Sequence, residues 1–489
     1  MSSKDDTNSS QAMSVPISVT PRFRPALDPG FVPAALWNRA YRAAGGSQPL
    51  TIALERSDGS VSVFPTQVLG DDPAHAPLNN FYVERLLKFL LWQKGGFRVT
   101  IAGSPAIAAH LARVYSPAGE RAFDYEFMGE RIYGKAMEVL SCAVDAAPQE
   151  RETTAPLGRH LEGCRIGFDL GASDRKCAAV VDGRVVFSEE VPWTPAIEAD
   201  PQYHFDGIDD SLRRAAARLP RVHAIGGSAA GVYVNNEVRV GSLYRSVPRD
   251  LFETRIRRLF FDLQTAWGGI PFEVVNDGEV TALAGSMARN DNAVLGVAMG
   301  SSLATGYVTP AGNITTWLNE LAFVPVDYRG LDGAAAPADE WSGDRGVGVQ
   351  YFSQQAVGRL LAPAGIELPD DMPLPVKLER VQEMMARGDA RARRIYETIG
   401  VYFGYTIAHY ADFYDFRNLL VLGRVLTGAG GDLILALASE VLREEFPEVA
   451  ERVSFHVPGE QEKRHGQAIA AASLPAIPSL EKHDGSQKA

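Results

Sequence analysis

The sequence predicts an α/β protein whose two similar halves face one cleft, with a separate α+β module ahead of them. Residues 165–187 and residues 294–314 each read as strand, polar turn, strand, tight turn and strand. After residue 164, short Val/Ile/Leu strands alternate with Gly-rich turns and helices. A chain of 489 residues also exceeds what one hydrophobic core organises, so two or three domains are expected.

The module is predicted from local signals between residues 40 and 145. A hairpin is expected at 50–64, around a Ser-Asp-Gly-Ser turn, followed by apolar residues at helical spacing from Val83 to Leu91. Gly95 and Gly96 end that helix, 97–102 alternates like a strand, and Ser104-Pro105 opens a second helix. The expected divisions are a polar tail and Pro-rich entry at 1–39, the module and its linker at 40–160, a first half at 161–290 with a C-terminal helix at 460–478, and a second half at 291–459.

Composition argues against several classes of partner. The formal net charge of -12 repels phosphate backbones, so nucleic acid is not expected as the main partner. The three cysteines, Cys142, Cys164 and Cys177, have neither paired spacing nor an even count, which disfavours a disulfide framework. No secretory signal is read at 1–14, and no run approaches the roughly 20 apolar residues of a membrane span. A cytoplasmic protein with polar tails at 1–14 and 481–489, and without a membrane partner, is expected.

The first hairpin turn carries Asp169-x-Gly171-x-Ser173-x-x-Lys176. A glycine in such a turn lets backbone amides approach phosphate oxygens, the serine adds a hydroxyl donor, and the aspartate can hold a hydrated Mg²⁺. A strand leaves this turn, and the Gly-x-x-x-x-Gly-Lys-Ser/Thr pattern of a P-loop is absent from the sequence. The alternative interpretation is an ordinary hairpin turn that binds no ligand.

Two further Gly-rich elements suit a nucleotide. The second turn, Gly300-Ser301-Ser302, offers small residues and hydroxyls to phosphate, although a plain polar turn explains it equally well. After a strand at 418–422, a loop containing Gly423, Gly430 and Gly431 leads into a helix at 432–445. A flat nucleoside can lie against such a backbone, but many α/β crossovers have the same pattern.

Carboxylates mark the candidate chemistry. Asn276-Asp277 stands at the end of a strand and the start of a helix, where open α/β sheets bind ligands. The alternative is that Asp277 only caps the helix. Glu320 lies beyond the second hairpin, where a solvated loop glutamate is the alternative.

The order of these motifs over residues 164–477, about two thirds of the chain, resembles the sugar-kinase branch of the actin, hexokinase and Hsp70 superfamily. It is most similar to the ROK family (repressors, open reading frames, kinases). The resemblance implies a two-lobed actin-like ATPase fold, of the ribonuclease H-like kind, with an additional N-terminal α+β module.

The resemblance also implies a role for each motif residue and the cofactors ATP and Mg²⁺. Asp277 matches the catalytic base of the family. The resemblance also implies a homodimer, the oligomeric state common in the family. The substrate-binding matches are Asn276, Glu320, Ser228 and Gly231. The ATP and phosphate matches are Asp169 (also Mg²⁺ through water), Gly171, Ser173, Lys176, Gly300, Ser301, Ser302, Gly423, Gly430 and Gly431.

Three features depart from the family pattern. Ala322-Phe323 follows Glu320 where many ROK proteins have Gly-His, and 344–350 contains no cysteine where they carry a zinc loop, so no zinc site is expected. The second phosphate turn continues with Ser302-Leu303 where a more Gly-rich string is typical, which lowers the expected affinity for ATP. The N-terminal module has no counterpart in the short family members.

The predicted function is an ATP-dependent kinase acting on a hydroxyl of a hexose-like sugar. One alternative is a sugar-responsive transcriptional repressor, which needs an N-terminal helix-turn-helix. The helices at 83–94 and 105–115 are its candidates, but the second is too apolar to read bases and a strand separates the two. The other alternative is a noncatalytic sugar-binding protein that retains the fold. For the module, covering the pocket, a dimer contact and binding of a regulator remain open.

Overall fold

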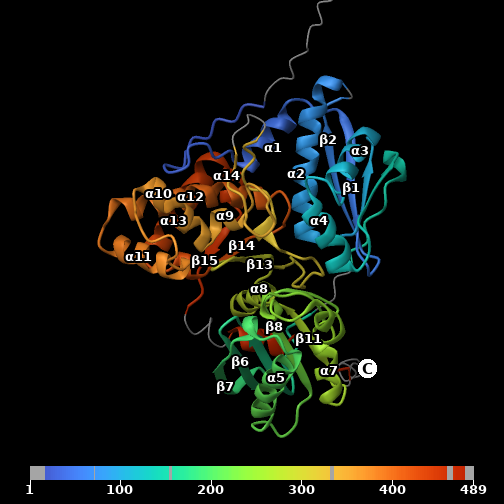
Figure 1. Cartoon of the computed structure of the whole chain (residues 1–489), viewed down its shortest axis with the longest axis vertical. Helices are drawn as coiled ribbons and strands as arrows, with labels where there is room; N and C mark the ends of the chain where they lie inside the picture. The colour runs from blue at the N-terminus through green and yellow to red at the C-terminus, as the bar shows by residue number, and fades with distance from the viewer. Residues whose placement is uncertain (1–16, 71, 153–156, 331–334, 460–465, 479–489) are drawn as a thin grey trace, which may run out of the picture.

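The computed structural model describes residues 17–70, 72–152, 157–330, 335–459 and 466–478. The predicted tails at 1–14 and 481–489, part of the linker at 153–156 and the first residues of the C-terminal helix expected at 460–478 lie outside the described residues. One lobe lies at one end of the molecule, and the N-terminal module and the other lobe lie side by side at the opposite end (Figure 1). No helix in the described part of the chain has the length and apolar character needed to cross a membrane.

The first lobe is built on a five-stranded sheet in the order β11-β8-β5-β6-β7. The predicted hairpins form its antiparallel half, because β5 pairs with β6 and β6 with β7. The other two strands run parallel to β5, and the lobe has a hydrophobic core of its own. Its main elements are β5 (Cys164–Leu170), β6 (Asp174–Val181), β7 (Arg184–Pro192), α5 (Pro201–Ala216), β8 (Ala224–Ala229), β9 (Val232–Val234), β10 (Glu237–Val240), α6 (Arg249–Leu251), α7 (Leu259–Ala266) and β11 (Phe272–Asn276).

The second lobe repeats the hairpin followed by parallel strands, in the order β13-β12-β14-β15. The third strand expected at its hairpin is reduced to a single bridge between Val308 and Ile314. Pro310 and Gly312 interrupt the strand there, so no continuous ladder of backbone hydrogen bonds forms. Its main elements are β12 (Val294–Met299), β13 (Leu303–Val308), α9 (Val349–Phe352), α10 (Gln354–Ala364), α11 (Leu374–Ala386), α12 (Ala390–Tyr410), β14 (Asn418–Leu422), α13 (Ala429–Glu445), α14 (Pro447–Ala450) and β15 (Ser454–His456).

The N-terminal module has the predicted hairpin and helices around a four-stranded sheet, in the order β2-β1-β3-β4. Gly95 ends the first long helix with φ 78°, and the Ser104 hydroxyl accepts the Ile107 N–H at the start of the next. Its elements are α1 (Ala34–Ala43), β1 (Gln48–Glu55), β2 (Val61–Val68), α2 (Ala76–Lys94), β3 (Arg98–Ala102), α3 (Pro105–Val114), α4 (Ala122–Glu126), the π-helix η2 (Phe127–Tyr133) and β4 (Glu138–Cys142).

The module and the second lobe share one hydrophobic core. Every residue of α2 from Tyr82 to Gln93 is buried, and twelve consecutive residues cover all sides of a helix. On the side of the second lobe, the ring of Phe89 stacks on that of Phe413 with 3.7 Å between centroids. The module is therefore fixed to the second lobe along the whole of α2.

Two close backbone contacts connect the lobes at α8 (Asp277–Arg289). This helix continues from β11 of the first lobe and crosses β13 of the second. A Cβ on Gly306 would lie 2.1 Å from the Gly278 carbonyl oxygen, so the two backbones approach as closely as they do only because both residues are glycine. The short helix α15 (Gln467–Ala472) lies equally close to the first sheet, where a Cβ on Gly167 would be 2.1 Å from the Ala468 oxygen. These contacts place the first residue of α8 at the boundary of the two lobes.

Candidate active site

Asp277 occupies the first position of α8, and its neighbour Asn276 caps the helix. The Asn276 Oδ1 accepts the Gly278 N–H at 2.7 Å, and its Nδ2 donates to the Gly231 carbonyl oxygen at 2.8 Å. Asp277 Oδ1 accepts the same Gly278 N–H at 3.0 Å. The cap is thus provided by Asn276, so capping alone does not explain an aspartate at position 277.

Three carboxylates from the two lobes influence one another across the cleft. Asp169 ends β5, Asp277 starts α8, and Glu320 follows the second hairpin. Burial, and then the charge of Asp169, raises the pKa of Asp277 to about 6. Burial, and then the charges of Asp277 and Glu279, raises the pKa of Glu320 to about 8. Carboxylates held together against their mutual repulsion are typical of functional sites.

We expect Glu320→Gln to stabilise the protein at alkaline pH. The folded state raises the pKa of Glu320 from 4.5 to about 8. Between these two pH values the native side chain stays protonated while the unfolded one is ionised, so stability falls as pH rises through this window. The amide removes this penalty, so the free energy of unfolding rises by about 1–3 kcal/mol at pH 8 and by less at pH 5. Urea unfolding at both values measures it. The exposed Glu451→Gln is the control and changes little at either pH; a loss of stability at pH 8 would contradict the prediction.

Of the two hairpin turns predicted to hold phosphate, the second presents free backbone donors. Gly171 N–H donates to the Asp174 carbonyl and Gly300 N–H to the Ser302 carbonyl, both at 2.9 Å. Among the described residues, no acceptor is bonded to the N–H groups of Ser301 and Ser302, which are exposed at the tip. Such donors fit the oxygens of an anion.

The first turn also places a carboxylate and an ammonium group beside each other. The Ser228 hydroxyl donates to Asp169 Oδ1 at 2.8 Å, while Lys176 Nζ lies 3.9 Å from Asp169 Oδ2. The Ser173 hydroxyl is bonded to Asp174. Within the described ranges, no three His, Cys, Asp or Glu side chains cluster to hold a metal ion by themselves. A Mg²⁺ near Asp169 therefore fits only as an ion that takes most of its ligands from water and phosphate, as Mg²⁺ commonly does.

The glycines assigned to the adenosine region have packing roles. Gly423 has φ +108°, and a Cβ there would lie 2.3 Å from the Met299 oxygen. A Cβ on Gly430 would meet the Tyr396 ring at 2.5 Å, and one on Gly431 would meet the Leu426 oxygen at 1.9 Å. Close packing alone requires these glycines, so their contact with a nucleoside stays a prediction.

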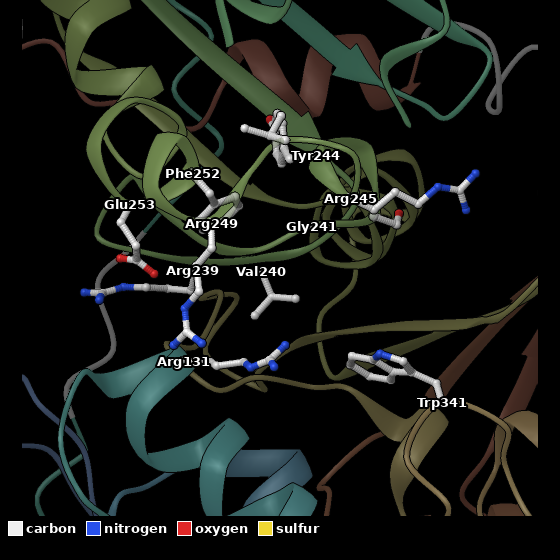
Figure 2. A pocket seen from close by; sticks show the side chains of 12 residues that line it. Arg131, Arg239, Val240, Gly241, Tyr244, Arg245, Arg249, Phe252, Glu253 and Trp341 are labelled. Carbon is white, nitrogen blue, oxygen red and sulfur yellow. The ribbon is translucent and has the colours of Figure 1, made fainter. Parts of the chain in front are cut away.

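A cavity of about 600 Å³ opens between the first lobe and the other two parts of the molecule (Figure 2). Residues 239–253 of the first lobe form one wall, and Arg131 of the module and Trp341 of the second lobe form the other. Sequence reasoning missed this wall, since none of its residues belongs to a recognisable motif.

One predicted sugar-binding residue, Gly231, packs against the cavity wall. Gly231 packs against Gly241 in the cavity wall so closely that a Cβ on Gly231 would lie 2.9 Å from the Gly241 Cα. On the opposite side, the ring of Phe323, three residues after Glu320, lies 5.0 Å from that of Trp341. Neither Gly231 nor Glu320 lines the cavity itself, but each lies close along the chain or in space to a residue that touches its wall.

Side chains of the module support the two segments that depart from the ROK pattern. Phe323, which replaces the expected histidine, packs on Trp92 of α2 with 4.5 Å between ring centroids. Asp344, in the loop without cysteines, accepts bonds from Lys88 and Arg121 of the module, both at 2.5 Å. An ion network thus holds a loop that carries a zinc site in many ROK proteins.

No protein-family model and no curated protein significantly matches the sequence. Solved structures do match. A ROK hexokinase from Thermus thermophilus is 17% identical, with 65% of this chain and 99% of that chain covered and a TM-score of 0.51. A ROK family transcriptional regulator, a homologue of the E. coli MLC protein, is 18% identical, with 64% and 79% covered and a TM-score of 0.52. The predicted fold class is confirmed: the chain has the two-lobed, actin-like fold of ROK proteins, extended by an N-terminal module.

Proposed function

We propose that the chain is a ROK family kinase that transfers the γ-phosphate of ATP to a hydroxyl of a hexose-like sugar in the cytoplasm. The observation that carries the proposal is the convergence of Asp169, Asp277 and Glu320, whose charges act on one another across the two lobes. Asn276, next to Asp277, donates to the Gly231 carbonyl oxygen, and Gly231 packs on the wall of a cavity of about 600 Å³. A cavity of this size fits a sugar-sized ligand. The hexokinase fold of the Thermus protein agrees with it.

In this mechanism Asp277 accepts the proton of the attacking hydroxyl. A carboxylate with a pKa of about 6 is mostly ionised at neutral pH and basic enough to take a proton as the bond to phosphorus forms. Glu320, with a pKa of about 8, is mostly protonated and can both donate to and accept from a sugar hydroxyl. Among the described residues Asn276 Nδ2 donates only to Gly231, so its second N–H can serve another hydroxyl.

Bound Mg²⁺-ATP would supply the phosphoryl group and neutralise the charge on its oxygens. The residues that would hold it are Asp169 and Lys176 at the first turn and the Ser301 and Ser302 amides at the second. Closure of the lobes would exclude water from this position and limit hydrolysis of ATP.

A transcriptional regulator is the second candidate, because one has the same fold at a TM-score of 0.52. In the module, however, α2 is buried on all sides and β3 separates it from α3. A recognition helix needs a free face to enter the major groove, so α2 does not serve as one. We therefore favour the kinase, without nucleic acid as a partner.

The proposal is tested by measuring ADP release by the full chain with Mg²⁺-ATP over hexoses, amino sugars, polyols and disaccharides. We expect at least one sugar to stimulate ADP release above the basal rate. Calorimetry that detects sugar binding while no sugar stimulates release would favour the noncatalytic sugar-binding protein. Salt-sensitive binding to promoter DNA would favour the regulator.

The pH dependence of the reaction should report the ionisation of Asp277. Below a pKa of about 6 the base is protonated, so kcat/KM for the sugar should fall tenfold for each pH unit lost. Initial rates between pH 5 and 8 at saturating ATP check this. The residual activity of Asp277→Asn should lack the acidic limb, and a flat wild-type profile from pH 5 to 7 would argue against Asp277 as the base.

A further inference from the structure

The wall of the large cavity carries more positive than negative charge, in a protein whose net charge is -12. Its lining contains four arginines, Arg131, Arg239, Arg245 and Arg249, and one carboxylate, Glu253. Figure 2 shows the arginines along the cavity, with Arg245 at one edge and extended away from the others. The excess of arginine is therefore a local feature that the overall composition does not produce.

Ion pairs account for part of this charge and leave the rest free. Arg131 binds Glu126 at 2.8 Å and Arg239 binds Glu237 at 2.7 Å, while Glu253 is paired with Arg257 outside the lining at 2.5 Å. Within each of these three ion pairs, the positive and the negative charge cancel. In the part of the chain that the structure describes, the Arg249 side chain has neither a hydrogen bond nor an ion pair.

Arg131 also keeps donors for a ligand. Its Nε and one terminal nitrogen contact the same Glu126 oxygen, and the other terminal nitrogen has no partner among the described residues. Arg131 comes from the module and Arg249 from the first lobe, so a group bound by both would bridge the cleft. Guanidinium groups bind phosphate and carboxylate oxygens through directed hydrogen bonds.

The cavity also contains an aromatic platform. Trp341 is 50% exposed, yet its ring packs against those of Phe123 at 4.8 Å, Phe127 at 5.3 Å and Phe323 at 5.0 Å between centroids. Three rings that fix a fourth and leave it half-exposed provide a rigid apolar surface. Such a surface suits the C–H face of a sugar ring, with polar groups around it fixing the orientation.

From this combination we infer that the cavity binds a sugar that carries an anionic group, a phosphate or a carboxylate, with Trp341 against the ring and Arg131 and Arg249 on the charge. The inference rests on the proposed function, since it names the class of sugar that the proposed kinase takes as acceptor. It also gives the module a direct part in substrate recognition, through Arg131.

The test is calorimetric titration of the full chain without ATP. The probes are glucose, mannose and galactose, the 6-phosphate and the uronate of each, and inorganic phosphate. We expect at least one anionic sugar to bind at least tenfold more tightly than its neutral parent and than inorganic phosphate. The phosphate and uronate arms identify the group that the cavity accepts.

Variants assign the binding to this wall. Arg131→Met and Arg249→Met should each weaken the anionic sugar about tenfold, the loss of one charged hydrogen bond, and change the neutral sugar less than twofold. Arg255→Met is the matched control, because Arg255 is exposed, follows Arg249 in the chain and does not line the cavity. This variant should bind like the wild type.

Failure of the inference is distinguishable from failure of the kinase proposal. Neutral sugars that bind as tightly as their anionic derivatives and stimulate ADP release would overturn the inference and leave the kinase intact. If an anionic sugar bound in an arginine-dependent way but did not stimulate ADP release, the inference would be supported and the proposed kinase activity would be rejected. No binding by any probe, or inorganic phosphate binding as tightly as the sugar phosphates, would overturn the inference.

Discussion

Asp277→Asn should reduce sugar-stimulated ADP release by about 10²–10⁴-fold, the usual contribution of a general base. The amide keeps the shape of the side chain but cannot accept the proton. Asn276 still caps α8 through the Gly278 N–H, so the fold should be unaffected. Steady-state ADP release measures the loss, and calorimetry should find sugar affinity within a fewfold of the wild type.

Asp200→Asn is the matched control for this variant. Asp200 caps α5 in the same lobe by accepting the Gln202 N–H at 2.9 Å, and asparagine caps helices equally well. Activity should therefore be unchanged. If Asp277→Asn retained full activity, or lost it only because sugar binding was lost, Asp277 would not be the base.

The parts of the fold that were predicted are those in which local chemistry determines the backbone. The turns at Gly171 and Gly300 each join two short apolar strands, and both hairpins form with the tips in the expected places. The start of α8 was likewise evident from a strand that runs into Asn276-Asp277. Turn and cap residues act over three or four positions, which is why one sequence suffices to find them.

The cavity wall was not predictable, because its residues are distant in the sequence and each is ordinary in its own segment. Arg131 looks like a surface residue after a helix, Arg249 like part of a polar loop, and Trp341 like an isolated aromatic. Only the packing of three parts of the molecule brings them together. Contacts between residues so distant in the sequence produce no periodicity or motif spacing from which the cavity could be predicted.

The burial of α2 was missed for a related reason. Only the helical spacing of its apolar residues from Val83 to Leu91 was predicted, and the charged Glu84, Arg85 and Lys88 stand between them. In the structure these charges are buried, because they pair with one another and with partners on α4, on the segment that follows α3 and on the second lobe. A charged residue indicates solvent only while its partner is unknown.

Lys88→Met should destabilise the protein by about 3–5 kcal/mol, the cost of removing one partner from a buried ion pair. Lys88 is fully buried, and its Nζ lies 2.8 Å from Asp124 and 2.5 Å from Asp344. These two charges raise the pKa of Lys88 despite its burial. Without the ammonium group, two buried carboxylates would repel each other between the module and the second lobe. Urea unfolding at pH 7 measures the effect.

The control is Arg98→Met, which removes a charge from the partly exposed ion pairs with Glu55 and Glu138 and should cost less than about 1 kcal/mol. Lys88→Met combined with Asp344→Asn should recover part of the loss, because one of the two stranded charges is gone. Since Asp344 holds the loop that carries Trp341, Lys88→Met should also weaken sugar binding more than Arg98→Met does. A Lys88→Met protein as stable as the wild type would mean that the module is not anchored through this network.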